Sequence, residues 1–284
     1  MSIRPLLDLL GPAIEGGYGV LALNVFDDLT LRTAIETAET QRAPIVIQTS
    51  VKTVRALGAK KLAGMFERSG SDSSMPVSLH LDHCPYREVI TECIANGWNS
   101  VLFDASHLKL NEATQQTAEV VAEAHANGVH VEGEVEGIQG VEDGIGSDGA
   151  PTVYSDDKIV DFIETTQVDC FAPAIGNAHG LYKAAPTLDV DRVRRLFGRT
   201  KVPMALHGGS GLTIAQFHEL ISAGCAKVNI STALKRTFVS SHREYLGDHT
   251  DSAEPLALIA HVRGQVAECV REHIELFAGA GSLR

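Results

Sequence analysis

The chain has 284 residues, with 24 lysines and arginines against 36 aspartates and glutamates, and a formal net charge of −12 at pH 7. This acidic balance argues against nucleic acid or an anionic membrane as partner, so an anionic substrate would need local cations or backbone amides. No stretch of about 18 apolar residues runs uninterrupted, and the five cysteines form no C-x-x-C pair, so we expect a cytoplasmic protein without a membrane span or a disulfide framework.

Eight short apolar runs are typical of buried strands, and helical patterns such as 30–42, 111–128 and 213–224 lie between them. The runs cover residues 20–26, 44–50, 77–83, 100–106, 129–136, 169–176, 202–208 and 226–232. This alternation predicts the α/β class, as a single (β/α)8 TIM barrel over residues 1–284. A doubly wound open sheet is the alternative.

Two further segments stand outside the alternation. Residues 255–277 predict an additional C-terminal helix, for which assembly between subunits is the expected role. The Gly-rich stretch at 137–152 follows the fifth strand. Its residues 137–150 are expected to form either a mobile loop over the barrel mouth or an ordinary surface loop.

Polar residues cluster where four of the strands end, and in barrels of this kind the chemistry sits at the carboxyl ends of the strands. The third strand ends in His80, Asp82 and His83, the fifth carries Glu132, Glu134 and Glu136, and His179 and His207 follow the sixth and seventh. A single histidine in a strand is usually structural, and we give His80 that interpretation or a role supporting a ligand. The coincidence at one rim points to a shared site.

His83, His179 and His207 could together supply the imidazole ligands of a catalytic Zn2+ site that keeps a position open for substrate. The sequence does not separate Zn2+ from other divalent metals such as Co2+ or Mn2+. Asp82, next to a candidate ligand, is suited to general acid or base chemistry, although a cap or an ion pair would also explain it.

A second group of residues predicts an anion site. "LHGGSGL" (206–212) and "KVNISTALKR" (227–236) follow the seventh strand and span the eighth. Glycines let backbone amides approach an oxyanion, and the loops after strands seven and eight are the usual phosphate site of these barrels. Gly-Ser clusters are more often plain turns, so the location carries the prediction.

Taken together, "SLHLDHCP", "VEGEVEGIQGVEDG", "AIGNAHGLYK", "LHGGSGL" and "KVNISTALK" resemble the class II, metal-dependent ketose-bisphosphate aldolases, the family of the fructose- and tagatose-bisphosphate aldolases. The resemblance covers essentially the whole chain, with the motifs in the family's order. It implies the same barrel and a retro-aldol cleavage through a zinc-stabilised enediolate, without a Schiff-base lysine.

The resemblance also implies roles for individual residues. His83, His179 and His207 match the zinc ligands, Asp82 matches the acid/base acting on the C4 hydroxyl, and Glu134 matches the carboxylate that assists proton transfer. Glu132 and Glu142 match supporting positions. The residues that match positions around dihydroxyacetone phosphate are Gly180, Gly208, Gly209, Ser210, Asn229 and Thr232, with Lys183 nearby, and a monovalent cation (Na+ or K+) is expected at Gly180, Gly208 and Ser210.

The aldehyde side of the site departs from the family pattern. Ser231 stands where fructose-bisphosphate aldolases usually have aspartate. Lys235 stands where those enzymes often place an arginine from a neighbouring subunit, and where tagatose enzymes tend to have lysine. Ser50 matches a contact to the distal phosphate but lacks the common continuation. Tagatose 1,6-bisphosphate, fructose 1,6-bisphosphate and other ketose 1-phosphates all remain open as substrates.

The sequence therefore predicts a zinc-dependent class II aldolase of carbohydrate metabolism that yields dihydroxyacetone phosphate and an aldehyde. A metal-dependent hydrolase on the same barrel and a non-catalytic phosphosugar-binding protein are the alternatives. As in the family, a homodimer or homotetramer is expected.

Overall fold

The computed structural model describes residues 2–147, 152–178, 180, 186–251 and 253–277. Its strands are β1 Val20–Asn24, β2 Ile45–Ser50, β3 Val77–Cys84, β4 Ser100–Asp104, β5 His130–Glu134, β6 Gly140–Glu142, β7 Ile145–Ser147, β8 Cys170–Phe171, β9 Met204–Leu206 and β10 Cys225–Ile230. Its helices are α1 Leu6–Gly16, α2 Asp28–Thr40, α3 Val51–Leu57, α4 Ala59–Ser71, α5 Arg87–Ala95, α6 Leu110–Ala126, α7 Asp156–Thr166, α8 Val190–Thr200, α9 Ile214–Ala223, α10 Thr232–Asp248 and α11 Pro255–Leu276.

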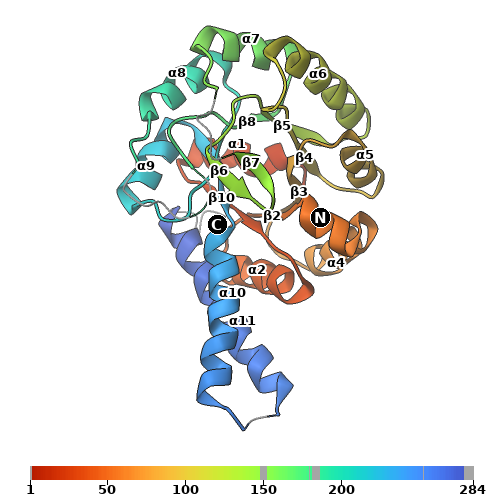
Figure 1. Cartoon of the computed structure of the whole chain (residues 1–284), viewed down its shortest axis with the longest axis vertical. Helices are drawn as coiled ribbons and strands as arrows, with labels where there is room; N and C mark the ends of the chain where they lie inside the picture. Colours follow the sequence, from red (N-terminus) through yellow and green to blue (C-terminus); the bar gives the residue numbers. More distant parts are fainter. Residues whose placement is uncertain (1, 148–151, 179, 181–185, 252, 278–284) are drawn as a thin grey trace.

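Eight parallel strands close into a barrel in the order β1-β10-β9-β8-β5-β4-β3-β2, and the helices form a ring around them (Figure 1). Closure is direct, because β1 pairs with both β2 and β10. This confirms the predicted (β/α)8 barrel, and the doubly wound alternative is wrong because an open sheet would leave its first and last strands unpaired with each other.

The strand after α7 is much shorter than its apolar run predicts, since 169–176 contributes only Cys170–Phe171 to β8. Ala172 still donates its N–H to the carbonyl of Gly133, at 3.0 Å. Pro173 then has no N–H to give, and the N–H of Ala174 bonds to the Glu136 carboxylate instead of a neighbouring strand. The chain therefore leaves the sheet early and turns toward the mouth.

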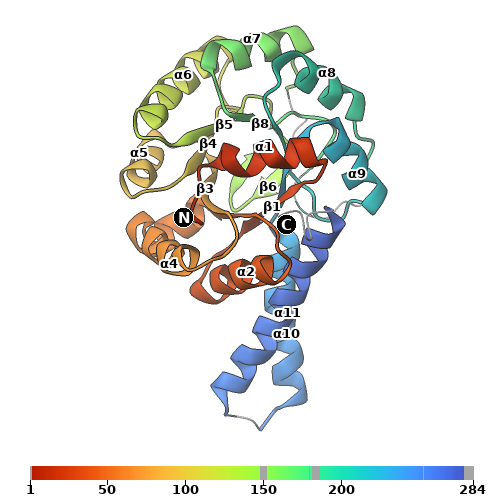
Figure 2. The same ribbon diagram turned by 180° about the vertical axis from the view of Figure 1, so that it is seen from behind.

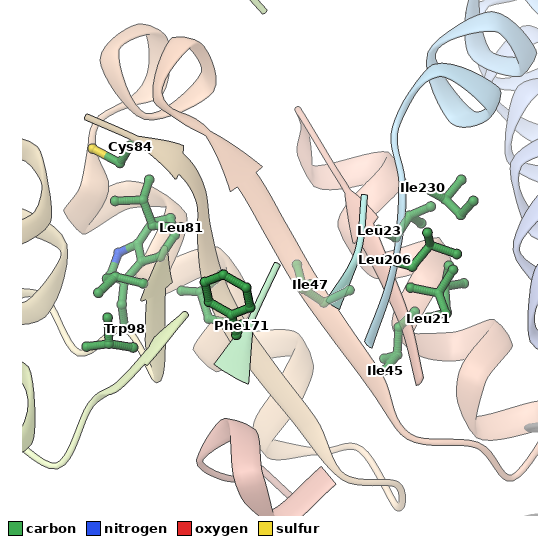
Figure 3. Close-up of a cluster of buried hydrophobic side chains, with 14 of the residues drawn as sticks. Leu21, Leu23, Ile45, Ile47, Leu81, Cys84, Trp98, Phe171, Leu206 and Ile230 are labelled. Atoms are coloured by element: carbon green, nitrogen blue, oxygen red, sulfur yellow. The ribbon is translucent and has the colours of Figure 1, made fainter. Parts of the chain in front are cut away.

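Alternating side chains build two hydrophobic clusters. Leu21, Leu23, Ile45 and Ile47 face outward and pack beneath the surrounding helices (Figure 3). Val20 and Ala22, one position away on β1, point inward and pack with the apolar face of α1. Helix α1 lies across the amino end of the barrel (Figure 2) and seals it. The carboxyl ends of the strands are left to form the mouth.

Helices α10 and α11 form a hairpin that projects from the barrel as an arm (Figure 1). The predicted C-terminal helix is confirmed as α11, whose inner half packs against α2 and whose end is fixed where Gly19 donates its N–H to the carbonyl of Phe277, at 3.0 Å. Among the described residues, no helix is long and apolar enough to cross a membrane.

The predicted Gly-rich loop contains regular structure of its own. Strands β6 and β7 pair antiparallel, with Gly140 opposite Ser147, and the hairpin lies over the centre of the barrel in Figure 1. Its base is joined to the segment after β8 by a bridge between Gln139 and Ala178. Residues 148–151 lie outside the described residues, so the choice between a mobile loop and a fixed one stays a prediction.

Candidate active site

The interior of the barrel changes from apolar to polar toward the mouth. On β1 the inward positions run Val20, Ala22, Asn24, and on β2 they run Val46, Gln48. All five side chains are buried. The polar ends of these and the neighbouring strands lie level with one another, because Asn24 pairs in register with Gln48 on the adjacent strand. A buried polar layer costs stability, so its presence marks this end as the candidate site.

Asp82 and His83 are consecutive, yet both side chains are buried at this end of β3. Strict alternation would send one of them outward. His83 instead has a φ of 41°, in the left-handed region that non-glycine residues rarely adopt, and the pairing of β3 with β4 shifts register between Leu81 and Cys84. A bulge and a strained residue at a strand end commonly aim a side chain at a functional site.

Ligand atoms of His83 and His207 come together with those of three carboxylates. One atom each from Asp82, His83 and His207 lie within 4.8 Å of one another, and so do one each from His83, Asp104 and Glu134. Oε2 of Glu134 is 3.4 Å from Nδ1 of His83 and 3.3 Å from Nδ1 of His207. Imidazole nitrogens and carboxylate oxygens at such spacing suit a divalent cation such as Zn2+. His179 lies outside the described residues.

His207 is oriented by a buried carboxylate. Its Nε2 lies 2.7 Å from Oε1 of Glu132, whose other oxygen is 2.9 Å from Nζ of the buried Lys227. Burial by itself would raise the pKa of Glu132, but Lys227 and His207 hold it well below its usual range. The ionised carboxylate only accepts hydrogen bonds, so Nε2 of His207 carries a proton, and Nδ1 is the nitrogen that faces Glu134 and would bind a metal once it is deprotonated.

The upper carboxylates crowd around His83. Burial lowers the pKa of His83, but Asp82, Glu134 and Asp104 together raise it well above its ordinary value. Burial and the neighbouring Asp104 raise the pKa of Glu134. The pKa of Asp104 falls to about 2, because its bonds to His83 and Ser106 outweigh burial. This half of the site is therefore rich in negative charge, which favours a bound cation.

Asp82 is held by two side-chain amides. Asn24 donates its Nδ2 to one carboxylate oxygen at 2.8 Å, and Asn229 donates to the other at 3.1 Å. Each amide is turned the right way by a donor at its own oxygen, Gln48 for Asn24 and Lys227 (2.6 Å) for Asn229. The resulting chain of bonds fixes the carboxylate in one orientation.

The predicted phosphate residues line one small cleft, beside the site and at the start of α10. Its lining consists of Gly180, Gly208, Gly209, Ser210, Asn229, Ser231 and Thr232. Gly208 has a φ of 68°, and a Cβ there would lie 2.2 Å from the carbonyl oxygen of Ala178. Only glycine allows that approach, and the positive end of α10 adds to the attraction for an anion.

Two other predicted residues lie outside this cleft. Ser50 pairs in register with Asp82 and its hydroxyl accepts the N–H of Thr53 at 3.4 Å, which caps α3. Lys235, on the first turn of α10, forms an ion pair of 2.8 Å with Asp143 of the β6–β7 turn. Lys183 lies outside the described residues.

Four residues of the site were not predicted from the sequence: Asn24, Gln48, Asp104 and Lys227. Each is a polar residue in or at the end of an apolar strand, which is a detectable signal. Lys227 is the clearest, since a lysine inside a buried strand needs an anionic partner. His80 lies beneath the site, where its Nδ1 is 2.8 Å from the hydroxyl of Ser100 and its Nε2 is 3.6 Å from Glu132.

Comparison with known proteins gives a consistent result. Residues 4–282 match the family model described as fructose-bisphosphate aldolase class-II. The crystal structure of a putative fructose-1,6-bisphosphate aldolase from Coccidioides immitis superposes with a TM-score of 0.90 at 27% identity, covering 97% of this chain and 96% of that one.

Two bacterial structures are also similar. The YdjI aldolase from Escherichia coli K12 gives a TM-score of 0.87 at 28% identity, covering 99% of this chain and 100% of its own. A fructose-bisphosphate aldolase from Campylobacter jejuni gives 0.85 at 20% identity, covering 99% and 97%, and supports the fold alone.

Proposed function

The chain belongs to the class II fructose-bisphosphate aldolase family, and on that premise we propose that it reversibly cleaves a ketose 1-phosphate or ketose 1,6-bisphosphate into dihydroxyacetone phosphate and an aldehyde. The observation that carries the proposal is the adjacency of the two groups at the mouth. The cluster of Asp82, His83 and His207 lies beside the glycine cleft, and Asn229 belongs to both through its bond to Asp82.

The donor set fits a divalent cation. We propose His83 and His207 as zinc ligands, with His179 as the third from the family resemblance. When bound, the metal would supply a Lewis acid that withdraws electron density from the substrate's carbonyl and hydroxyl oxygens. Glu132 would support the metal site without binding the metal itself, because it fixes the tautomer of His207.

Asp82 is suited to take the proton of the C4 hydroxyl. Its two oxygens are oriented by Asn24 and Asn229, so the carboxylate is held ready without a change of rotamer. As the C3–C4 bond breaks, the electron pair stays with the three-carbon phosphate half and a carbonyl forms on the aldehyde. Glu134, whose pKa is raised by burial and Asp104, can return a proton to the three-carbon half.

The cleft would hold the 1-phosphate. Amides around Gly208 and Gly209, the Ser210 hydroxyl and the start of α10 offer donors without a cationic side chain. Anchoring the phosphate there aligns the reacting carbons with Asp82, so remote binding energy serves orientation. A monovalent cation at Gly180, Gly208 and Ser210 remains part of the proposal.

The proposal extends to the end of the substrate that becomes the aldehyde. Ser231 lines the cleft and Lys235 sits one turn along α10, paired with Asp143. Lys235 is about one third exposed, so a distal phosphate could replace its carboxylate partner. This arrangement favours a 1,6-bisphosphate, of either the tagatose or the fructose series.

The test is direct. Fructose and tagatose 1,6-bisphosphates are offered separately, and dihydroxyacetone phosphate is followed by a coupled reductase. Both a chelator and Asp82→Asn should suppress release, the latter by about 10²- to 10⁴-fold, while metal analysis finds Asp82→Asn still loaded. Undiminished release from metal-free protein, or phosphate release without triose phosphate, would refute the proposal.

We also propose a homo-oligomer formed through the arm. Among its described residues, four large apolar side chains are exposed: Val239 (46%), Leu246 (52%), Leu256 (72%) and Ile259 (46%). Such a group on a projecting hairpin is suited to bury itself against a second copy. Leu246→Asp with Leu256→Asp should therefore yield monomers in sedimentation velocity.

The five cysteines, all free and buried, support a reducing, cytoplasmic location.

A further inference from the structure

A buried ion pair lies just behind the mouth, on the side of β5 and β8. Glu136, two residues after β5, is completely buried, and Arg192, on the first turn of α8, is almost completely so. The pair is bidentate, with Nη2 of Arg192 2.8 Å from Oε1 of Glu136 and Nη1 3.0 Å from Oε2. None of the proposed chemistry uses either residue.

The same two side chains hold the backbone of two other segments. Glu136 accepts the N–H of Tyr154 at 2.7 Å and that of Ala174 at 3.1 Å. Arg192 donates to the carbonyl oxygens of the same two residues, at 2.8 Å for Tyr154 and 2.5 Å for Ala174. Every oxygen of the carboxylate and both terminal nitrogens of the guanidinium are thus committed to this junction, which we call the clamp.

Two segments leave the barrel at the clamped residues, the β6–β7 hairpin and residues 174–178, and we call them the mouth segments. The chain departs after Glu136 into the β6–β7 hairpin and returns at Tyr154. At Ala174 it departs again toward the cleft, along residues 174–178.

Beyond the clamp, the second segment touches the candidate site directly. Asn177 donates its Nδ2 to the carbonyl of His207 at 3.0 Å. The carbonyl of Ala178 packs against Gly208, and Ala178 bridges to Gln139 at the base of the hairpin. Ala178 is also the last described residue before the predicted ligand His179. The clamp therefore controls where this segment starts, a few residues from the site.

We propose that the Arg192–Glu136 clamp is a positioning device that sets the two mouth segments at a fixed height over the barrel and thereby aligns the metal and phosphate groups with β5 and β9. Its effect on metal and phosphate binding rests on the function proposed above, whereas its effect on the position of the two segments does not. The fork of the guanidinium is essential, because one lysine ammonium cannot bond both carboxylate oxygens and two carbonyls in this geometry.

A matched control lies one turn along the same helix. Arg195 pairs with Asp156 at 2.6 Å, the carboxylate that Arg192 also reaches through Nε at 3.2 Å. Arg195 is half exposed, and its ion-pair partners among the described residues are Asp156 and Asp189 rather than Glu136. Arg195→Lys therefore alters the outer ion pairs but removes no bond between Arg192, Glu136, Tyr154 and Ala174, so it should leave the clamp and zinc binding unchanged.

The first measurement uses metal-free protein and hydrogen exchange. Arg192→Lys and, as a second variant, Glu136→Asp should speed exchange of the Tyr154 and Ala174 amides about 10- to 100-fold, the range for losing a hydrogen bond to a charged group. Amides in α2, on the other side of the barrel, report global stability and correct for it. Selective acceleration is expected. Equal acceleration everywhere, or none, would overturn the clamp.

The second measurement titrates zinc alone against a chelator, and records the absorption spectrum of the Co2+-loaded protein. Both clamp variants should weaken zinc binding about tenfold and alter the Co2+ spectrum, as loss of outer support does at metal sites. Unchanged zinc affinity despite faster exchange would make the pair purely structural and overturn its positioning role. If the wild type itself fails to bind zinc, the proposed function fails while the exchange result stands independently.

Discussion

Glu132 and Glu134 stand two residues apart on β5, both buried at the mouth, and their surroundings are opposite. Glu132 faces Lys227 and His207, and its pKa is held down. Glu134 faces Asp104 and two imidazoles, and its pKa is raised. One carboxylate is neutralised by the chain itself, whereas the other is buried beside a second carboxylate, Asp104, and these two effects outweigh the two imidazoles.

The two carboxylates of this motif therefore have different roles: Glu132 supports neighbouring side chains, and Glu134 belongs to the part of the site that would bind the cation. The half around Glu132 is a completed network in which every charge has a partner, and its task is to orient His207 and Asn229. The half around Glu134 carries excess negative charge that folding alone does not compensate. Stored repulsion of that kind is what a bound cation relieves, so the two halves should respond oppositely to the same substitution.

The largest expected effect comes from removing the cation of the completed half. Lys227→Met leaves Glu132 buried without its cation and should cost about 3–5 kcal/mol in the free energy of unfolding. Adding Glu132→Gln to that variant should recover much of the loss, since no charge is then stranded. Urea denaturation of metal-free protein measures both. Equal stability of the single and double variants would show that Lys227 does not neutralise Glu132.

A smaller and opposite effect is expected in the other half. Glu134→Gln removes like-charge repulsion with Asp104 and should stabilise the metal-free protein by about 1 kcal/mol, while zinc binds about 10- to 100-fold more weakly. Glu132→Gln is the matched control, because the identical change two residues away should destabilise. Calorimetry with and without zinc compares them, and the same sign for both variants would contradict the division.

The pH dependence sharpens the comparison further. His83 and His207 have pKa values raised above 6.5 by the surrounding carboxylates, so their stabilisation of the metal-free protein is complete below about pH 6.5 and is lost as pH rises through the raised values. Zinc needs the neutral imidazoles, so its affinity should rise about tenfold per pH unit for each proton displaced. Melting temperatures from pH 6 to 9 should diverge between zinc-loaded and chelated samples; parallel curves would count against both ligands.

Much of this arrangement is predictable from sequence because it follows a repeating pattern. Buried strands of a parallel barrel are continuous apolar runs, and all eight barrel strands overlap the predicted runs, although most of them end earlier than predicted. Asp82, His83 and His207 stood out because they end such runs. The cleft followed from the position of "HGGSG" after the seventh strand, and its lining matches that prediction closely.

The rest depends on partners that are distant along the chain. Asn24 and Lys227 look like isolated polar residues until Asp82 and Glu132 lie beside them. Arg192 sits in an arginine-rich helix where surface ion pairs would be the ordinary explanation, and only folding brings it to Glu136. Pro173 is a local signal for the early end of β8, but the bond from the Ala174 N–H to Glu136 depends on a residue 38 positions away.

The smallest predicted effect is that His80 does not titrate near neutral pH. This tests the boundary between the half around Glu132 and the half around Glu134. His80 lies beneath the site, where burial and Lys227 lower its pKa to about 3. It should therefore stay neutral between pH 5 and 8 in NMR spectra of the metal-free protein, while His83 and His207 change with pH. Because the unfolded chain would protonate this histidine below about pH 6.5 and the folded one would not, His80 also takes stability away as pH falls toward 3. Ser100→Ala, which removes its 2.8 Å partner, should leave it neutral. A His80 resonance that titrates near 6.5 would mean that water reaches His80 and that Lys227 does not act on it, so that the half around Glu132 is not a closed network.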